Sequence, residues 1–208
     1  MIYNNHYNTN ERKCVMKLYH GTISSGAENI IKNGIKISKG KPKVDFGQGF
    51  YTTPSFAFAQ STAINKAKKT NMFGGAYVTP CILTYEFDNI RAREDCKILS
   101  FNDIDIKWAQ FIINNRNGFE YMKAIGSNFH NIKHNYDIVQ GAIADNKIVL
   151  LAETLGRLNK KIDPLEINDI IYYYLTKQIS FHTIKSLSYI KLTSYDIIKE
   201  KKGDVVNG

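Results

Sequence analysis

The sequence lacks several features that would assign it to a well-marked class. No apolar run approaches the roughly 20 residues needed to cross a bilayer, and residues 1–6 have neither the basic nor the apolar segment of a signal peptide. Its three cysteines show no Cys-x-x-Cys spacing, which argues against a disulfide framework and against a zinc site. Rossmann and P-loop glycine motifs are also absent. We therefore expect a cytoplasmic protein with free thiols, no membrane partner and no metal.

The composition predicts a folded chain with a basic surface. Of 208 residues, 43% are hydrophobic and 12% aromatic, which is enough for a sizeable core. The formal net charge of +9 would attract nucleic acids or phosphate-bearing ligands. However, the lysines are scattered among isoleucine, asparagine and tyrosine, and no run of five or six basic residues occurs. The charge is therefore compatible both with merely solvated lysines and with an anionic ligand.

Hydrophobic periodicity, glycine and proline divide the chain into strands and helices. We expect strands over residues 15–20, 35–37, 46–52, 78–87, 97–101, 136–144, 179–183 and 187–194, the last two forming a hairpin around Lys185 and Ser186. We expect helices over residues 26–33, 54–69 and 103–116, from Asp145 to residue 158, and from Asp163 to residue 176. The expected N-caps are Ser25 (in a capping box with Glu28), Thr53, Asp145, and either Asn102 or Asp103.

Other positions predict how these elements end and pack. Gly34 is the expected C-cap of the first helix. Ala59, Ala63 and Ala67 share one face of the second helix, and Trp108 belongs to the core.

The order of these elements predicts an α+β fold. The helices do not recur regularly enough for a doubly wound parallel sheet, and no internal repeat or domain boundary is visible. We expect a single domain over residues 15–199, with mixed or antiparallel sheets, between flexible tails over residues 1–14 and 200–208. Met16 is an alternative start to Met1.

Two glycine-containing stretches carry the residues of chemical interest. Residues 18–22 read Leu-Tyr-His-Gly-Thr, and residues 45–53 read Asp-Phe-Gly-Gln-Gly-Phe-Tyr-Thr-Thr. Glycine at a strand end lets backbone approach a ligand closely, and His20 adds an imidazole. Tyr51 follows a glycine-permitted bend that could expose its ring for stacking. Each residue alone also has a purely structural explanation, but together they predict one shared cleft.

These stretches resemble the first two motifs of ADP-ribosyltransferases of the His-Tyr-Glu type, the group that includes diphtheria toxin and the poly(ADP-ribose) polymerases. The sequence is more closely similar to a bacterial family catalogued as domain of unknown function 3990. Members of that family similarly carry an Asp-Ile-Val-x-Gly-x-x-Ala-Asp segment, here residues 137–145, and a terminal Gln-Ile-Ser-Phe-His-Thr, here residues 178–183. The four blocks occur in the same order and cover about residues 17–195.

The resemblance implies an ADP-ribosyltransferase-like fold with a split core and flanking helices, and NAD as co-substrate. It implies that His20 hydrogen-bonds a ribose hydroxyl, that the Gly21 backbone holds the nicotinamide carboxamide, and that Tyr51 stacks on the nicotinamide ring. It places Gln178 where relatives have the catalytic glutamate. The implied chemistry is loss of nicotinamide through an oxocarbenium-like state and capture of ribose C1 by a nucleophile. The residues expected to contact NAD are His20, Gly21, Thr22, Tyr51, Thr53 and Asp145.

Gln178 is the main departure from the family pattern. A glutamate hydrogen-bonds the ribose 2′-OH and puts a full negative charge near the developing cation. The Gln178 amide oxygen can accept the same hydrogen bond but carries no charge, and losing one charge-assisted contact can cost about 2–4 kcal/mol of transition-state stabilisation. Asp145 is the candidate substitute carboxylate, with a helix N-cap as its structural alternative. His182 either faces the site with Gln178 or bonds to a backbone carbonyl. Asp45 and Gln48 flank the second motif and could touch cofactor or target.

Two functions follow as hypotheses. The first is an NAD-dependent mono-ADP-ribosyltransferase with a protein or nucleic-acid acceptor, acting as the toxin of a toxin–antitoxin pair or in phage defence; NAD hydrolysis is a variant of it. An antitoxin protein is then a further expected partner. The second is a catalytically silent module that binds nucleic acid or a protein. The helix after Tyr51 lacks the serine-rich pattern and second tyrosine of the polymerases, which argues against polymer formation.

Overall fold

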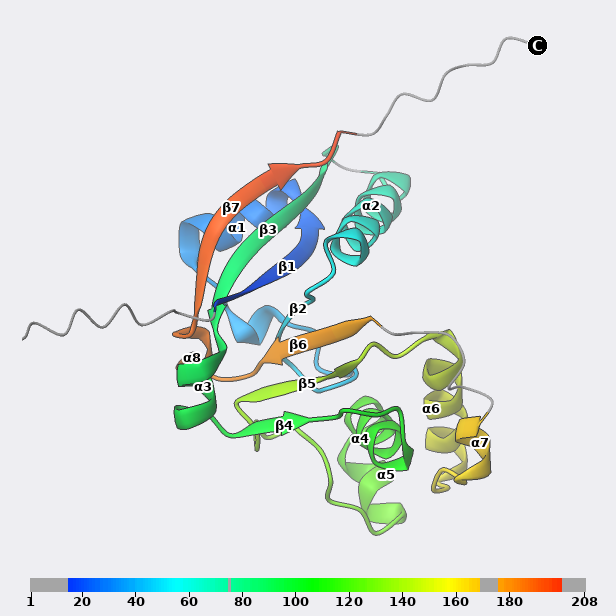
Figure 1. The fold of residues 1–208 in the computed structure, drawn as a ribbon. Helices are drawn as coiled ribbons and strands as arrows, with labels where there is room; N and C mark the ends of the chain where they lie inside the picture. The colour runs from blue at the N-terminus through cyan, green and yellow to red at the C-terminus, as the bar shows by residue number, and fades with distance from the viewer. Residues whose placement is uncertain (1–14, 75, 169–175, 200–208) are drawn as a thin grey trace, which may run out of the picture.

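The computed structural model describes residues 15–74, 76–168 and 176–199, which form two β-sheets with flanking helices (Figure 1). The first sheet is antiparallel in the order β1 (Val15–Ile23), β3 (Pro80–Asp88), β7 (Ile190–Ile197). The second sheet has the order β2 (Phe50–Thr52), β6 (Lys177–Phe181), β5 (Ile138–Ala142), β4 (Ile98–Ser100). It is mixed, because β4 and β5 run parallel. The predicted α+β class with mixed and antiparallel sheets is confirmed. The predicted tails lie outside the described residues.

The two sheets pack against a common apolar cluster. Strand alternation turns Leu18 and Leu83 of the first sheet toward Ile179 and Phe181 of the second, and all four are buried together. The sheets also touch through the backbone, because Tyr19 and Thr53 exchange two N–H···O bonds of 2.8 and 2.9 Å. This bridge holds the central part of β1 beside the end of β2.

A second apolar cluster lies on the other face of the second sheet. It is formed by α4 (Ile106–Asn117), α5 (Phe119–Ala124), α6 (Asn146–Leu158) and residues of β5. Trp108 is 1% exposed in this cluster, and its indole N–H donates to the Ala142 carbonyl at 3.1 Å. The prediction that Trp108 is a core residue is confirmed.

Helices α1 (Ser24–Asn33) and α2 (Phe56–Met72) flank the first sheet (Figure 1). The predicted alanine face of α2 is buried, and Gly34 ends α1 with a φ of 72°, as expected for a glycine C-cap. The N-cap of α2 is Ser55 rather than Thr53. The Thr53 hydroxyl instead donates to the Lys177 carbonyl at 2.8 Å, so the helix begins two residues later than predicted.

Several local predictions were wrong. The Ser25 capping box does not form: α1 starts at Ser24, directly after β1, and no side chain caps it. The strand expected over residues 35–37 does not form. Residues Ile37–Lys39 form a 3-10 turn, and the Gln48 amide donates to the Ser38 carbonyl within this turn and to the Gly40 carbonyl directly after it. The N-cap of α4 is Asp105, which accepts the Trp108 N–H at 2.8 Å, and neither Asn102 nor Asp103.

The expected C-terminal hairpin was also wrong. Strands β6 and β7 belong to different sheets and are separated by α8 (Ile184–Leu187), which Thr183 caps. Helices α3 (Asn89–Asp95) and α5 were not predicted from the sequence. Within the range expected to be helical from Asp163 to residue 176, residues Leu165–Asn168 form α7, and residues 169–175 lie outside the described residues. Within the described ranges, no helix is both long and apolar enough to cross a membrane.

Candidate functional site

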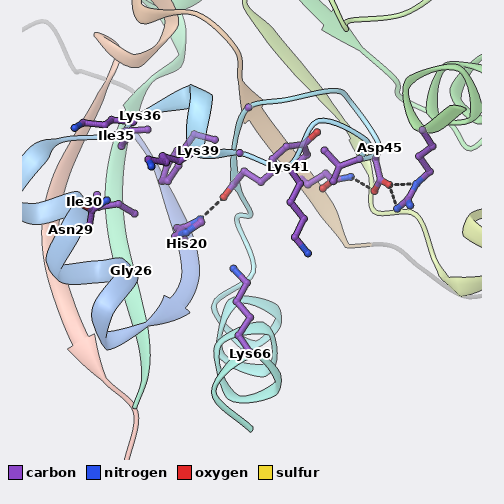
Figure 2. Close-up of a pocket in the computed structure, with 17 residues that line it drawn as sticks. His20, Gly26, Asn29, Ile30, Ile35, Lys36, Lys39, Lys41, Asp45 and Lys66 are labelled. Carbon is purple, nitrogen blue, oxygen red and sulfur yellow. Dashed lines mark hydrogen bonds and ion pairs between the residues drawn. The ribbon is translucent and has the colours of Figure 1, made fainter. Parts of the chain in front are cut away.

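A cavity of about 520 Å³ opens between α1, the loop over residues 35–49, and the strands β1, β2 and β6 (Figure 2). A smaller cavity of about 90 Å³ lies toward α2. Both are lined by His20, Tyr51, Lys66 and Gln178, so the two cavities adjoin at these side chains. The three residues predicted to be catalytic therefore come together, although they belong to three strands in two sheets.

His20 presents a hydrogen-bond acceptor to the cavity. Its Nδ1 lies 2.7 Å from the Tyr51 carbonyl oxygen, and its ring packs against Phe50 with 4.6 Å between centroids. Burial, and secondarily the charge of Lys66, lowers the pKa of His20 to about 4, so the ring is neutral at neutral pH. A carbonyl only accepts, so the single ring proton is on Nδ1 and Nε2 keeps its lone pair. No described protein group binds Nε2, which remains available to a ligand hydroxyl.

Gly21 and Thr22 have different surroundings from those predicted. Gly21 lines the smaller cavity, but its carbonyl accepts the Lys66 ammonium at 2.7 Å. A Cβ on Gly21 would lie 2.1 Å from the Ala59 carbonyl oxygen, so the packing of α2 on β1 by itself requires glycine here. Thr22 is 7% exposed, lines neither cavity and lies beside Gly26. The structure thus does not place Thr22 with the other site residues.

The Tyr51 hydroxyl fixes the glycine-rich bend that precedes it. It donates to the Gly47 carbonyl at 2.6 Å and accepts the Phe46 N–H at 3.0 Å. Gly47 adopts a φ of 86°, which this bend requires. Burial raises the pKa of Tyr51 well above its ordinary value. The hydroxyl is therefore committed to the backbone, and the ring lines both cavities.

Gln178 and Asp45 form a buried polar pair, and each is 7% exposed. The Gln178 Nε2 donates to Asp45 Oδ2 at 3.0 Å. The other carboxylate oxygen, Oδ1, accepts both Nε and Nη2 of Arg116, at 2.9 and 2.6 Å. All three residues line the larger cavity. Asp45 is thus the carboxylate at this site.

The side chains of Thr53 and Asp145 make hydrogen bonds to backbone groups. Thr53 lines the smaller cavity, where its hydroxyl bonds to the Lys177 carbonyl and accepts the Ser55 N–H at 3.1 Å. Asp145 is the N-cap of α6 and accepts the Ile148 N–H at 3.0 Å. It lines neither cavity, so the structural alternative for Asp145 is the one observed.

His182 is fully buried beneath the bend and faces no cavity. Its Nδ1 lies 2.9 Å from the Gln48 carbonyl oxygen, and its Nε2 lies 2.8 Å from the Ser180 hydroxyl. Of the two predicted alternatives, the bond to a backbone carbonyl is the one observed. Its ring meets the Tyr51 ring edge to face at 6.2 Å, so it supports Tyr51 from below.

Basic side chains surround the larger cavity, and Asp45 is the single acidic residue among the described residues that line it. Lys66 extends from α2 into the same space as His20 and Lys41 (Figure 2). Burial, and then the charge of Lys41, lowers the pKa of Lys66. The sequence held a weak signal for Lys66, which lies three residues after Ala63 and so beside the buried face of α2. The basic lining residues are Lys36, Lys39, Lys41, Lys66 and Arg116.

Metal-ligating groups are not clustered in the part of the chain that the structure describes. No three histidine, cysteine, aspartate or glutamate side chains there could hold a metal ion together. Cys81 and Cys96 are buried free thiols.

The family model described as "Protein of unknown function (DUF3990)" matches residues 16–192, and the chain belongs to this family. The match runs from β1 into β7 and includes every residue that lines the two cavities. No curated protein and no solved structure matches the chain.

Proposed function

We propose that this family member is an NAD-dependent mono-ADP-ribosyltransferase that transfers ADP-ribose to a macromolecular acceptor and releases nicotinamide. The observation that carries the proposal is the convergence of His20, Tyr51 and Gln178 on two adjoining cavities with a basic lining. These are the three positions expected from the resemblance of the sequence to the His-Tyr-Glu transferases. The ADP-ribosyltransferase-like fold is part of the same proposal, supported by the two packed sheets.

The residues present fit NAD in chemistry and in size. A volume of about 520 Å³ lies within the range of small-molecule and cofactor sites. The His20 Nε2 lone pair suits a ribose hydroxyl, and the Tyr51 ring offers an apolar face to the nicotinamide. Lys39 and Lys41 suit the pyrophosphate, because ammonium groups pair with phosphate oxygens.

In the proposed reaction, the bond between ribose C1 and the nicotinamide nitrogen breaks, and its electron pair leaves with nicotinamide. The acceptor nucleophile forms a new bond to C1 and releases its proton to solvent. Gln178 would accept the ribose 2′-OH through Oε1, to which no described residue donates. Water in place of the acceptor would give NAD hydrolysis.

The test is incubation with labelled NAD and whole-cell extract, measuring nicotinamide release and the label on protein and nucleic acid separately. We expect label in one macromolecular fraction, and at least about tenfold less with Tyr51→Ala or Gln178→Ala. Tyr77→Ala and Gln140→Ala are matched controls, because Tyr77 is 75% exposed and Gln140 bonds to Ser100 on β4, and neither lines a cavity. Absence of both NAD binding and nicotinamide release would end the proposal.

The cellular role proposed with this activity is that of a toxin, either in a toxin–antitoxin pair or in phage defence. Induced expression should then arrest growth, and the Gln178→Ala variant should relieve the arrest. A co-expressed antitoxin protein would relieve it without any change in the chain.

The basic cavity lining favours one second candidate, a catalytically silent module that binds nucleic acid. Lys36, Lys39 and Lys41 lie together on one loop at the cavity. This candidate predicts binding that weakens steeply with salt and that His20→Ala leaves unchanged. A strict dependence on His20 would count against it.

A further inference from the structure

On the basis of the proposed function, we propose that Asp45 is a positioning residue for Gln178, which holds the amide so that its oxygen faces the ribose. The Asp45–Gln178 pair then does together what a single glutamate does in the His-Tyr-Glu transferases.

The orientation of the amide follows from its partner. A carboxylate accepts but does not donate, so the group of Gln178 that lies 3.0 Å from Asp45 Oδ2 must be the NH₂. The amide oxygen must then be on the opposite side of the side chain. A glutamine without such a partner could present either atom to the ribose, and only the oxygen can accept its hydroxyl.

Asp45 is itself held in place from two sides. Arg116 makes two hydrogen bonds to Oδ1, and the Ala144 N–H lies 3.4 Å from Oδ2. Charge-assisted bonds of this kind are stronger and more directional than neutral ones. The negative Oδ2 also polarises the amide toward its oxygen, which makes the oxygen a better acceptor.

This arrangement makes a glutamate at position 178 harmful in the natural chain. In Gln178→Glu, two carboxylates would face each other at about 3 Å, and like charges that close resist joint ionisation. In the double variant Gln178→Glu with Asp45→Asn, the amide introduced at position 45 would donate to the carboxylate introduced at position 178. The carboxylate and the amide would then have exchanged positions, and the pair would keep one negative charge and one NH₂ group.

The pH dependence of nicotinamide release by the Gln178→Glu variant gives a second test of the pair. Two facing carboxylates share one proton at low pH, which removes the repulsion between them and lets the carboxyl group at position 178 keep its place beside the ribose. Nicotinamide release by Gln178→Glu should therefore recover as the pH falls from about 8 to about 5. The His20 ring titrates lower, at about pH 4, and does not account for a recovery in this window. The charged or titratable groups facing Gln178 are Asp45, Arg116, His20, Tyr51 and Lys66.

The experiment measures kcat and KM for nicotinamide release by the natural chain, the two single variants and the double variant. We expect each single variant to lose at least about tenfold in kcat, with KM changed by less than about threefold. The double variant should recover most of that loss. A double variant no better than the worse single variant, or an Asp45→Asn variant equal to the natural chain, overturns the proposal. Thermal midpoints of all four proteins separate a folding defect from a kinetic one.

A second measurement keeps this proposal separate from the proposed function. If the natural chain releases no nicotinamide, the proposed function fails, and nuclear magnetic resonance of the Gln178 side-chain amide still reports on the pair. We expect its NH₂ resonances to move in Asp45→Asn, while those of Gln140, which bonds to Ser100, stay in place. Unmoved Gln178 resonances overturn the positioning role by themselves.

Discussion

Two regions of the molecule contain a histidine in almost the same electrostatic state, but only one of them is a candidate site. Burial lowers the pKa of both His20 on β1 and His182 after β6 to about 4. In each ring, Nδ1 lies beside a backbone carbonyl, at 2.7 Å and 2.9 Å respectively. The difference is at Nε2, which in His182 meets the Ser180 hydroxyl and in His20 lines a cavity.

The difference shows that a shifted pKa does not by itself mark a functional residue. Desolvation shifts any buried imidazole, whether or not a ligand reaches it. The informative feature is a polar atom at a cavity wall that has no hydrogen-bond partner among the described residues. By that criterion, the Nε2 of His20 and the Oε1 of Gln178 are candidate contacts, and His182 supports the bend beneath Tyr51.

The largest effect expected from this comparison is on folding, at His182. His182→Ala would open a cavity and leave the buried Gln48 carbonyl and Ser180 hydroxyl with one partner fewer, at a cost of about 3–4 kcal/mol in the free energy of unfolding. Chemical denaturation measures it, with His20→Ala as the matched control. His20→Ala should cost about 1–2 kcal/mol, since only the Tyr51 carbonyl loses its partner. Equal costs for the two variants would remove the distinction between the regions.

The same comparison explains how far the sequence could be read. The sequence predicted strands that contain His20 and Tyr51 and a strand that begins directly after Gln178, while the order of the three residues came from the family resemblance; in the structure all three residues lie on strands. The N-cap predicted at Asp145 was also correct, and it is the one of the four predicted N-caps that the structure has.

Hydrogen-bond partners that lie far apart in the sequence could not be predicted. The contact between Asp45 and Gln178 joins the second motif to β6, and no periodicity connects positions that far apart. Thr53 failed as an N-cap for the same reason, since its hydroxyl is used by Lys177 of a distant strand. The 3-10 turn at residues 37–39 depends on the side chain of Gln48 from the following bend. At Thr53 and at the 3-10 turn, a tertiary hydrogen bond overrode a local preference.

The next effect is the pH dependence of stability. Both histidines are neutral when folded and have a pKa lowered from 6.5 to about 4, so the unfolded chain binds more protons in this range. Their contribution is complete above about pH 6.5 and is lost as the pH falls toward about 4. We expect the free energy of unfolding to drop by about 2 kcal/mol for His182 between about pH 7 and about pH 5, and by less for the half-buried His20. His20→Gln should therefore remove the smaller share of the slope. If the slope disappears in His20→Gln, the pH dependence of stability comes from His20 and not from His182, and the prediction is wrong.

A smaller effect concerns catalysis, in which His20 should matter more than His182. If NAD binds as proposed, His20→Ala removes the acceptor for a ribose hydroxyl and should lower kcat/KM for nicotinamide release by about tenfold. The measurement needs a temperature at which the variant is folded, with Tyr77→Ala as the exposed control. An undiminished rate would show that the Nε2 of His20 does not contact the substrate.

The smallest effect tests the cause of the lowered pKa at His20. Burial is the larger cause and the charge of Lys66 the second, so Lys66→Met should raise the pKa of His20 from about 4 while leaving it below 6.5. Titration of the His20 ring protons by nuclear magnetic resonance measures the shift. Lys68→Met, on an exposed face of the same helix and away from both cavities, is the control. An unchanged pKa would mean that the Lys66 ammonium, despite its bond to the Gly21 carbonyl, is screened from the ring. A rise to the ordinary value would mean that charge rather than burial keeps His20 neutral, and the likeness to His182 would then be superficial.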